Sequence, residues 1–374
     1  MDDLTIANSV SDLILGDIQE HLPFDRIPLK GDVLGLGTTT SVDNGELTFL
    51  QDGDQASAIW RCVASDGSIR RLQRGDGIGH FPYVCFTRDA SDLRRPVALD
   101  RLLVQEGRPL QDLIAEAIVM GQRDGVLEEA PIYGLRLMAH WHDLVITVAS
   151  KLCMGQQRRN AGLATSAEGI QTAELSIYDM LQHYRLAPIA PDSSDGPIRY
   201  LGRSMQWDCC GFYDTQPELG RVTVPQPGAH LHLHGCSTDL AYGGHLHHEH
   251  DLTRLHRLER LVLYPLQSIG SLGSDLMVDQ VRYVSGELKF RVCNSGELDV
   301  NDVGVAVVLN DVYSSHRYLR LPWMSAGATE EFSMAWELPQ GQHRITVLVD
   351  PEARVIEAEE RRANNQTMVF VQVD

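Results

Sequence analysis

The sequence of residues 228–245 is Gly228-Ala-His-Leu-His-Leu-His-Gly-Cys-Ser-Thr-Asp-Leu-Ala-Tyr-Gly-Gly-His245. On a β-strand, residues i and i+2 face the same side, so His232 and His234 are expected to point the same way. The pair Gly243-Gly244 would let a second strand return close by and present His245 at the same spot. Three neutral imidazoles with one open position are the ligand set of a catalytic zinc ion. The stretch therefore predicts a β-hairpin that carries a metal site.

A simpler interpretation stays open, because this region is rich in histidine. His230, His247, His248 and His250 lie in the same stretch. The three histidines above could then be surface residues of a hairpin or part of an incidental His-rich tract. Spacing alone makes the metal site a hypothesis, and the other four histidines remain alternative ligands.

Length and charge restrict the classes of protein to consider. A chain of 374 residues is long enough for two domains, each with its own core. The net charge of −19 argues against a surface for nucleic acid or for an anionic membrane. No apolar stretch approaches membrane-spanning length, and the acidic start is not followed by a signal-peptide apolar segment. The odd number of scattered cysteines, 7, favours reduced thiols. A cytoplasmic protein is expected.

The first two thirds of the chain alternate between short strands and turns, with few helices. Turn dipeptides at Asn44-Gly45, Asp52-Gly53 and Asp66-Gly67 predict a β-meander over residues 33–73. Further strands are expected at 81–87, 132–137, 198–213 and 219–224. A helix is expected at 110–120 with Gly121 as its stop, a shorter one around 175–181, and loops at 155–170 and 191–196. The glycines Gly75, Gly77 and Gly79 precede a strand, so they do not form a dinucleotide loop, which must open a helix.

The composition changes at Ser268–Ser274, where Gly270 and Gly273 predict a linker. After it, short alternating strands recur about every ten residues, as in a β-sandwich. The candidates are residues 281–284, 288–292, 303–309, 331–336 and 345–349. The expected organisation is an N-terminal extension at 1–24, a zinc domain at 25–268, a linker at 269–274 and a β-sandwich at 275–374.

Several blocks of the first domain, in the right order, resemble the acetolactate decarboxylase family over residues 25–268. The family's His-Leu-His, Ser, Asp and Gly-Gly-His elements resemble His232-Leu-His234, Ser237, Asp239 and Gly243-Gly-His245 here. Its Gly-Leu-Gly-Thr and Asp-Gly-Glu-Leu elements resemble Gly35-Leu-Gly-Thr38 and Asp43-Asn-Gly-Glu46-Leu, with one residue inserted. The resemblance implies an α+β fold, with a mixed sheet, a β-barrel and few helices.

The resemblance also implies a function. Zn²⁺ would be bound by His232, His234 and His245, with Glu46 as a nearby carboxylate and Thr38 as a polar contact beside it. The substrate would be acetolactate or a related 2-hydroxy-3-keto acid. Loss of carbon dioxide leaves an enediolate, whose charge zinc stabilises and which a nearby acid must protonate. Without the resemblance, Glu46 would be an ordinary exposed residue after a turn.

Two departures from the family concern the groups that hold the substrate. The family's Thr-Arg segment corresponds to Leu144-Val-Ile-Thr-Val148, which has no arginine at the match. Lys151, Arg158 or Arg159 could substitute for it. No residue matches the glutamate in the family's C-terminal tail. In addition, His247 and His248 stand where the family has apolar or acidic groups.

Residues 275–374 resemble the CARDB-type immunoglobulin-like modules. The matching elements are Asp275-Leu276, Val292-Cys-Asn294-Ser-Gly296 and the closing stretch from Val349-Asp-Pro-Glu to Asn364-Asn365. The resemblance implies a β-sandwich that could bind a protein partner. Trp336, on an alternating strand, is expected in its core.

Three functions remain open. The first is a zinc-dependent lyase that decarboxylates acetolactate or a close relative. The second is a diverged zinc enzyme on the same fold, an isomerase, cyclase or hydrolase of specialised metabolism, which the two departures favour. The third is a non-catalytic zinc-containing binding protein, which an open coordination position fits less well. A homodimer is possible in each case.

Overall fold

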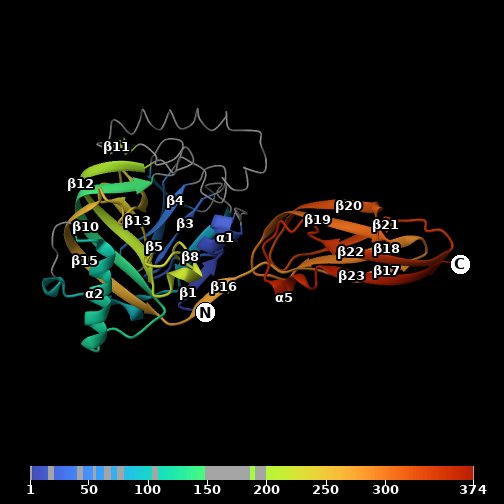
Figure 1. The fold of residues 1–374 in the computed structure, drawn as a ribbon, viewed down its shortest axis with the longest axis horizontal. Helices are drawn as coiled ribbons and strands as arrows, with labels where there is room; N and C mark the ends of the chain where they lie inside the picture. Colours follow the sequence, from blue (N-terminus) through green and yellow to red (C-terminus); the bar gives the residue numbers. More distant parts are fainter. Residues whose placement is uncertain are drawn as a thin grey trace. The chain divides into compact units, whose positions relative to one another are not determined.

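The computed structural model describes residues 2–15, 21–39, 45–53, 56–62, 69–73, 80–102, 108–147, 186–189 and 199–373. These residues divide into two compact units. Residues 2–15 and 22–271 form the first unit, and His21 with residues 272–373 forms the second. The described part of the chain is mostly β-structure with few helices, which confirms the expected class (Figure 1). None of its helices is long and apolar enough to cross a membrane.

The first sheet of the N-terminal unit has seven strands in the order β16-β1-β8-β3-β4-β5-β6. Those of its strand pairings for which the register is described are antiparallel. Strands β2 and β7 form a separate two-stranded antiparallel sheet. The strands are β1 (Leu4–Ala7), β2 (Leu22–Pro23), β3 (Gly35–Thr38), β4 (Glu46–Gln51), β5 (Ser57–Cys62), β6 (Ile69–Arg71), β7 (His80–Phe81), β8 (Tyr83–Thr87) and β16 (Ile269–Leu272).

The second sheet also has seven strands, in the order β11-β12-β13-β14-β10-β15-β9, and β12 pairs with β10 as well. Because of this extra pairing, the strands β10, β12, β13 and β14 close into a ring. The strands are β9 (Arg95–Pro96), β10 (Ile132–Thr147), β11 (Leu186–Ile189), β12 (Arg199–Asp214), β13 (Leu231–Ser237), β14 (Gly243–Leu246) and β15 (Arg254–Leu266).

Helix α2 (Leu110–Arg123) provides much of the core of this unit. Its buried residues Leu113, Ile114 and Ala117 share a hydrophobic cluster with Leu137 and Trp141 of β10. That cluster occupies one face of the second sheet, which leaves the opposite face to pack against the first sheet. The remaining helices of the unit are short: α1 (Val10–Leu15) and the 3₁₀ turns Phe24–Arg26, Ser91–Leu93, Leu99–Arg101 and Pro217–Leu219.

A buried ion pair ties the two sheets together. The Arg136 Nε of β10 lies 2.7 Å from Asp32 Oδ1, and both side chains are almost fully buried. The remaining guanidinium nitrogens donate to the carbonyl oxygens of Phe49 and Val33, each at 2.8 Å. The hydroxyl of Tyr264 donates to Asp32 Oδ2 at 2.7 Å. With these partners the pair fixes how β4 faces the second sheet.

Replacing Asp32 with alanine should destabilise the N-terminal unit by about 3–5 kcal/mol, because it leaves the Arg136 charge buried without a counterion. Urea unfolding of the variant and the wild type measures this difference. Asp52→Ala is the matched control, since Asp52 pairs with Arg71 at the surface and should change stability by less than about 1 kcal/mol. Equal effects of the two substitutions would contradict the structural role of the buried pair.

The C-terminal unit is a β-sandwich of a three-stranded and a four-stranded sheet. Apolar residues of both sheets form its core, and Trp336 lies buried there, as expected from the sequence. The first sheet has the order β17-β18-β21 and the second β20-β19-β22-β23. Their bounds, with the short helix α5 (Glu359–Arg362), are β17 (Leu276–Val284), β18 (Glu287–Asn294), β19 (Val300–Leu309), β20 (Val312–Met324), β21 (Thr329–Ala335), β22 (Gly341–Val349) and β23 (Gln366–Val373).

Several expected boundaries differ from the structure. Helix α2 does not stop at Gly121 but continues to Arg123, and the glycine serves packing instead: a Cβ there would lie 2.9 Å from the Cβ of Leu127. Residues 219–224 form no strand, since Gly220 adopts a left-handed φ of 58° after a 3₁₀ turn. β20 and β23 were not expected from the sequence. The alternating pattern extends further along the chain than the segments chosen for it.

The proposed ends of the zinc domain also take part in its first sheet. Residues 4–7, assigned to an extension, form β1, which pairs with β8. Residues 269–272, assigned to a linker, form β16, which lies next to β1. Neither segment is a free tail or tether. The turns at Asn44 and Asp66, the glycines Gly75, Gly77 and Gly79, the helix around 175–181 and the loops at 155–170 and 191–196 lie outside the described residues.

Candidate metal centre

The histidine hairpin forms as expected and faces the first sheet. His232 and His234 lie on β13, two residues apart. His234 is the direct partner of His245 across the β13–β14 pairing, so the two side chains share one face of the sheet. Gly235 is opposite Gly244, whose φ of 154° suits glycine. The sequence thus brings the three side chains together through strand alternation and a close return at Gly243-Gly244.

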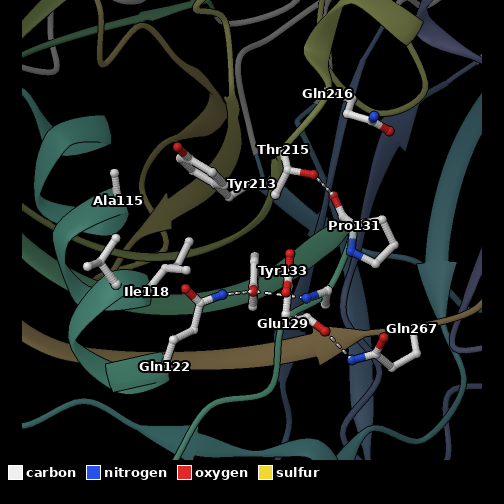
Figure 2. A pocket seen from close by; sticks show the side chains of 12 residues that line it. Ala115, Ile118, Gln122, Glu129, Pro131, Tyr133, Tyr213, Thr215, Gln216 and Gln267 are labelled. Atoms are coloured by element: carbon white, nitrogen blue, oxygen red, sulfur yellow. Dashed lines mark hydrogen bonds between the residues drawn. The ribbon is translucent and has the colours of Figure 1, made fainter. Parts of the chain in front are cut away.

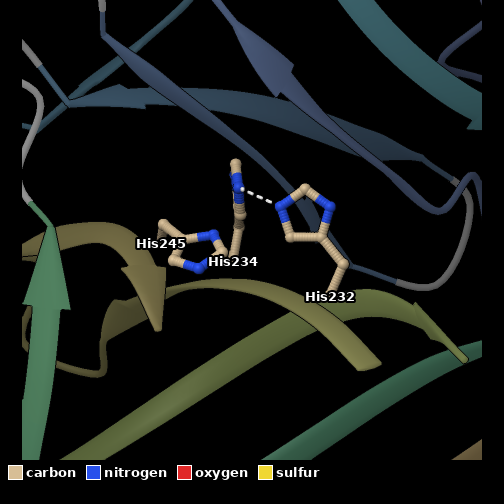
Figure 3. Close-up of side chains that lie close together, drawn as sticks. All are labelled: His232, His234 and His245. Atoms are coloured by element: carbon tan, nitrogen blue, oxygen red, sulfur yellow. Dashed lines mark hydrogen bonds between the residues drawn. The ribbon is translucent and has the colours of Figure 1, made fainter. Parts of the chain in front are cut away.

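The three imidazoles converge on one point (Figure 3). One ring nitrogen from each of His232, His234 and His245 lies within 4.8 Å of the others, an arrangement that could hold a metal ion. The Nε2 atoms of His232 and His234 are 3.2 Å apart. Two nitrogens bound to one tetrahedral zinc at the usual Zn–N distance would be ~3.3 Å apart. The spacing therefore suits a shared cation.

The opposite ring nitrogens are held by the backbone. His232 Nδ1 lies 2.6 Å from the carbonyl oxygen of Val222, and His234 Nδ1 lies 2.8 Å from that of Leu47. A carbonyl only accepts, so each Nδ1–H donates and each Nε2 of the neutral ring keeps its lone pair. Two lone pairs facing each other at 3.2 Å repel unless a cation lies between them. Metal-binding histidines commonly have this backbone partner.

Burial keeps these ligands neutral. It lowers the pKa of His232 to about 4 and lowers the pKa of His234 and His245 well below their ordinary value. A metal can bind only the unprotonated nitrogen. The three side chains are therefore in the metal-binding form at neutral pH.

The first sheet contributes Glu46 to the same place. Glu46 Oε2 lies 3.6 Å from His234 Nε2, and the glutamate side chain is 16% exposed. Burial raises the pKa of Glu46 to about 8. Gly45, the residue before it, packs closely on Cys62, where a Cβ would lie 2.4 Å from the Cys62 carbonyl oxygen. Thr38 is the direct partner of Glu46 in the β3–β4 pairing, so both side chains are on one face.

The other histidines of the stretch have different partners. His230 Nδ1 lies 2.7 Å from the Asp214 carbonyl oxygen, and its ring stacks on Tyr213. His248 Nε2 lies 2.9 Å from the Leu231 carbonyl oxygen, and His250 Nδ1 accepts a hydrogen bond from Leu252 N. His247 lies beside the cluster, with its ring centre 4.7 Å from that of His245. Within the described part of the chain, His232, His234 and His245 are the one group of side chains whose ligand atoms lie close enough together to hold a metal ion.

Ser237 and Asp239, which belong to the matched motif, shape the hairpin and do not line the site. Ser237 Oγ donates to Asp239 Oδ1 at 2.7 Å and accepts from Tyr242 N at 2.9 Å. These bonds hold the turn that returns the chain to His245. The candidate cations Lys151, Arg158 and Arg159 lie outside the described residues.

Sequence reasoning missed one arrangement at this site. Thr147, the last residue of β10, lies with its Oγ1 2.6 Å from His247 Nε2. The Nδ1 of His247 lies 3.0 Å from Glu249 Oε1. The alternation of His245 and His247 was the one available signal. It could not reveal Thr147, which is 100 residues away in the sequence.

A hollow of about 610 Å³ lies elsewhere in the unit, between α2 and the ends of β10 and β12 (Figure 2). His232, His234, His245 and Glu46 do not line it. Several of its polar side chains bond to one another or to the backbone: Gln122 donates to the Tyr133 hydroxyl, Gln267 to the Glu129 carbonyl oxygen and Thr215 to the Pro131 carbonyl oxygen. These polar groups are already satisfied within the fold, so the hollow is a weaker candidate than the histidine cluster.

Comparison with known proteins agrees with the expectation for the C-terminal unit. Residues 275–369 match the CARDB family model. The CARDB domain expected from the sequence is confirmed. A comparison with curated proteins gave no match.

Solved structures similar to this chain include both expected families. One is the X-ray structure of alpha-acetolactate decarboxylase from Bacillus subtilis strain 168, which is 16% identical. That match covers 72% of this chain and 87% of the other, with a TM-score of 0.45. A CARDB domain from Pyrococcus furiosus, solved by NMR, is 24% identical and covers 27% of this chain and 94% of its own, with a TM-score of 0.23. The crystal structure of that domain in complex with di-metal ions is 23% identical. That match covers 27% of this chain and 93% of the other, with a TM-score of 0.22.

Proposed function

We propose that this chain is a zinc enzyme whose N-terminal unit binds Zn²⁺ through His232, His234 and His245. One observation carries the proposal: the Nε2 atoms of His232 and His234 face each other at 3.2 Å, while their Nδ1 atoms are engaged by backbone carbonyls. Structural zinc sites are closed by four protein ligands, whereas catalytic sites keep one position for water or substrate. Three protein ligands therefore favour catalysis over a purely structural role.

The proposed reaction is decarboxylation of acetolactate or a related 2-hydroxy-3-keto acid, as the sequence motifs suggest. Zinc at the site would supply Lewis-acid stabilisation of negative charge on the substrate oxygens. Glu46 is placed beside the ligands, where its carboxyl group can deliver or remove a proton at the reacting carbon. Thr38, on the same face, would help orient the substrate.

A second candidate is a diverged zinc enzyme that acts on a neutral hydroxycarbonyl compound, as an isomerase, cyclase or hydrolase. Its support is electrostatic. Burial raises the pKa of Glu46, so negative charge is disfavoured beside the ligands. A substrate with a free carboxylate is usually bound by a cationic partner. The ionisable group that the described residues place beside the ligands is Glu46, which offers no positive charge to such a substrate.

Incubation of the zinc-loaded protein with racemic acetolactate tests the first candidate. If it is a decarboxylase, acetoin and carbon dioxide should form in equal amounts, and the His234→Ala variant should form neither above the spontaneous rate. A zinc-loaded wild-type protein that produces no acetoin would exclude this reaction and leave the second candidate. A protein that binds no zinc would contradict both.

A further inference from the structure

Three further histidines lie together on β10 and β15, outside the ligand set described above. The ring centre of His256 lies 5.4 Å from that of His140 and 4.3 Å from that of His142. His142 and His256 are exposed, and His140 is half-buried. Within the first histidine cluster the ring centres are 4.9, 5.0 and 5.4 Å apart. His256 is therefore about as close to its two neighbours as the proposed zinc ligands are to one another.

An irregularity in the β10–β15 pairing places His256 beside the other two. On β15, Arg257 pairs with His140 and Leu255 pairs with Trp141. The residue between them, His256, has no opposite partner in this pairing. An extra residue of this kind is a β-bulge, which bends the strand and redirects the side chain that it carries. The bulge thus brings a third imidazole to a pair that already lies on the neighbouring strand.

Strand alternation places His140 and His142 on one face of β10, since Trp141 between them is buried in the core shared with α2. Two imidazoles bound to one ion through nitrogens ~2.0–2.1 Å from it would have ring centres ~4.5–5.2 Å apart. The two distances measured from His256 lie on either side of this range. The three ring nitrogens do not meet at one point in the present rotamers, but the exposed side chains of His142 and His256 can turn to bring them together.

A carboxylate lies close to the same group. Glu259 Oε2 accepts a hydrogen bond from Gln206 Nε2 at 2.6 Å, and Gln206 is the direct partner of His140 in the β10–β12 pairing. Hydrogen bonds from Arg257 and Gln206 lower the pKa of Glu259, with a smaller contribution from His140. Glu259 therefore carries a negative charge, which is paired with Arg257. This pairing offsets the charge of the arginine that lies opposite His140, so it does not repel a bound cation.

We propose that His140, His142 and His256 form a second metal site, which binds a divalent transition metal ion of the class that prefers imidazole, with Cu²⁺ bound most tightly. Imidazole suits copper, nickel and zinc, whereas Mg²⁺ and Ca²⁺ prefer oxygen ligands, and affinity in the first-row series is highest for Cu²⁺. The site shares no residue with the proposed zinc site and does not depend on it. Because it lies at the surface, it should bind metal less tightly than the buried cluster.

Equilibrium dialysis against Cu²⁺ tests this. The His234→Ala variant, which lacks the buried site, should bind one Cu²⁺ per chain, and Mg²⁺ should not compete. In that background His256→Ala should weaken binding at least ~10-fold, since affinity falls 10- to 100-fold even when a ligand loses only its outer hydrogen-bond partner. His250→Ala is the matched control and should change nothing, because His250 belongs to neither group and accepts a hydrogen bond from Leu252 N.

The metal-free wild-type protein provides a second measurement that does not depend on the folding of His234→Ala. It should bind two Cu²⁺ per chain, and its His256→Ala variant should bind one at the concentration that fills both sites. His256 is exposed, so this substitution should preserve the fold. If Cu²⁺ does not bind to His234→Ala, or if His256→Ala leaves binding unchanged, the second site is overturned and the proposed zinc site stands. Equal binding by the wild type and His234→Ala, with loss on His256→Ala, would support the second site and contradict the buried one.

Discussion

Replacement of His234 with alanine should remove the bound metal almost completely. His234 is the most central ligand: its Nε2 is 3.2 Å from that of His232, and it lies directly opposite His245. Its side chain is only 2% exposed, so solvent cannot readily replace it as a ligand. The wild-type protein should contain close to one zinc per chain, and His232→Ala, His234→Ala and His245→Ala should each contain little. Metal analysis after gel filtration measures this.

His230→Ala is the matched control for these variants. It lies in the same stretch, but its ring bonds to the Asp214 carbonyl oxygen and stacks on Tyr213. Its removal should leave the zinc content unchanged. Loss of zinc from His230→Ala, together with retention in His245→Ala, would show that a different set of histidines binds the metal.

Glu46→Gln should lower turnover of acetolactate by about 10²- to 10⁴-fold, the usual contribution of a positioned acid or base. The amide has the shape of the carboxyl group but cannot transfer its proton. Glu46 lies beside His234 and is not among the three ligands, so zinc content and melting temperature should change little. Steady-state rates, metal analysis and thermal unfolding on the same samples separate these effects.

Glu116→Gln serves as the control for Glu46→Gln. Glu116 pairs with Arg108 on helix α2 and contacts none of the three histidines. Its substitution should leave turnover intact. If Glu46→Gln keeps wild-type turnover as well, Glu46 has no part in the reaction.

The histidine hairpin could be predicted because its geometry is local. Alternation along one strand places His232 beside His234, and a glycine pair lets the next strand bring His245 opposite. Five of the seven strands of the C-terminal unit, all except β20 and β23, were visible for the same reason. In each case the information lies within about ten to twenty neighbouring residues.

Contacts between distant segments could not be found in this way. Glu46 reaches His234 only because the first sheet packs on the second, and the sequence resemblance was needed to select it. The Thr147–His247 contact depends on the return of β14 to the end of β10. Likewise, β1 and β16 come from opposite ends of the N-terminal unit, and pairing between them is invisible to local periodicity.

Other expectations stay predictions: a cytoplasmic location, a homodimer, a small keto or hydroxy acid as substrate, and a protein partner for the CARDB domain. So does the absence of nucleic-acid and membrane binding. The six described cysteines are buried and form no disulfide with one another, and Cys153 lies outside the described residues.

X-ray absorption at the zinc edge of the metal-loaded wild-type protein tests the central claim most directly. The account predicts three histidine nitrogens at ~2.0–2.1 Å and one further light atom from water, the signature of an open catalytic site. A fourth protein ligand, such as a cysteine sulfur at ~2.3 Å or another imidazole, would contradict it.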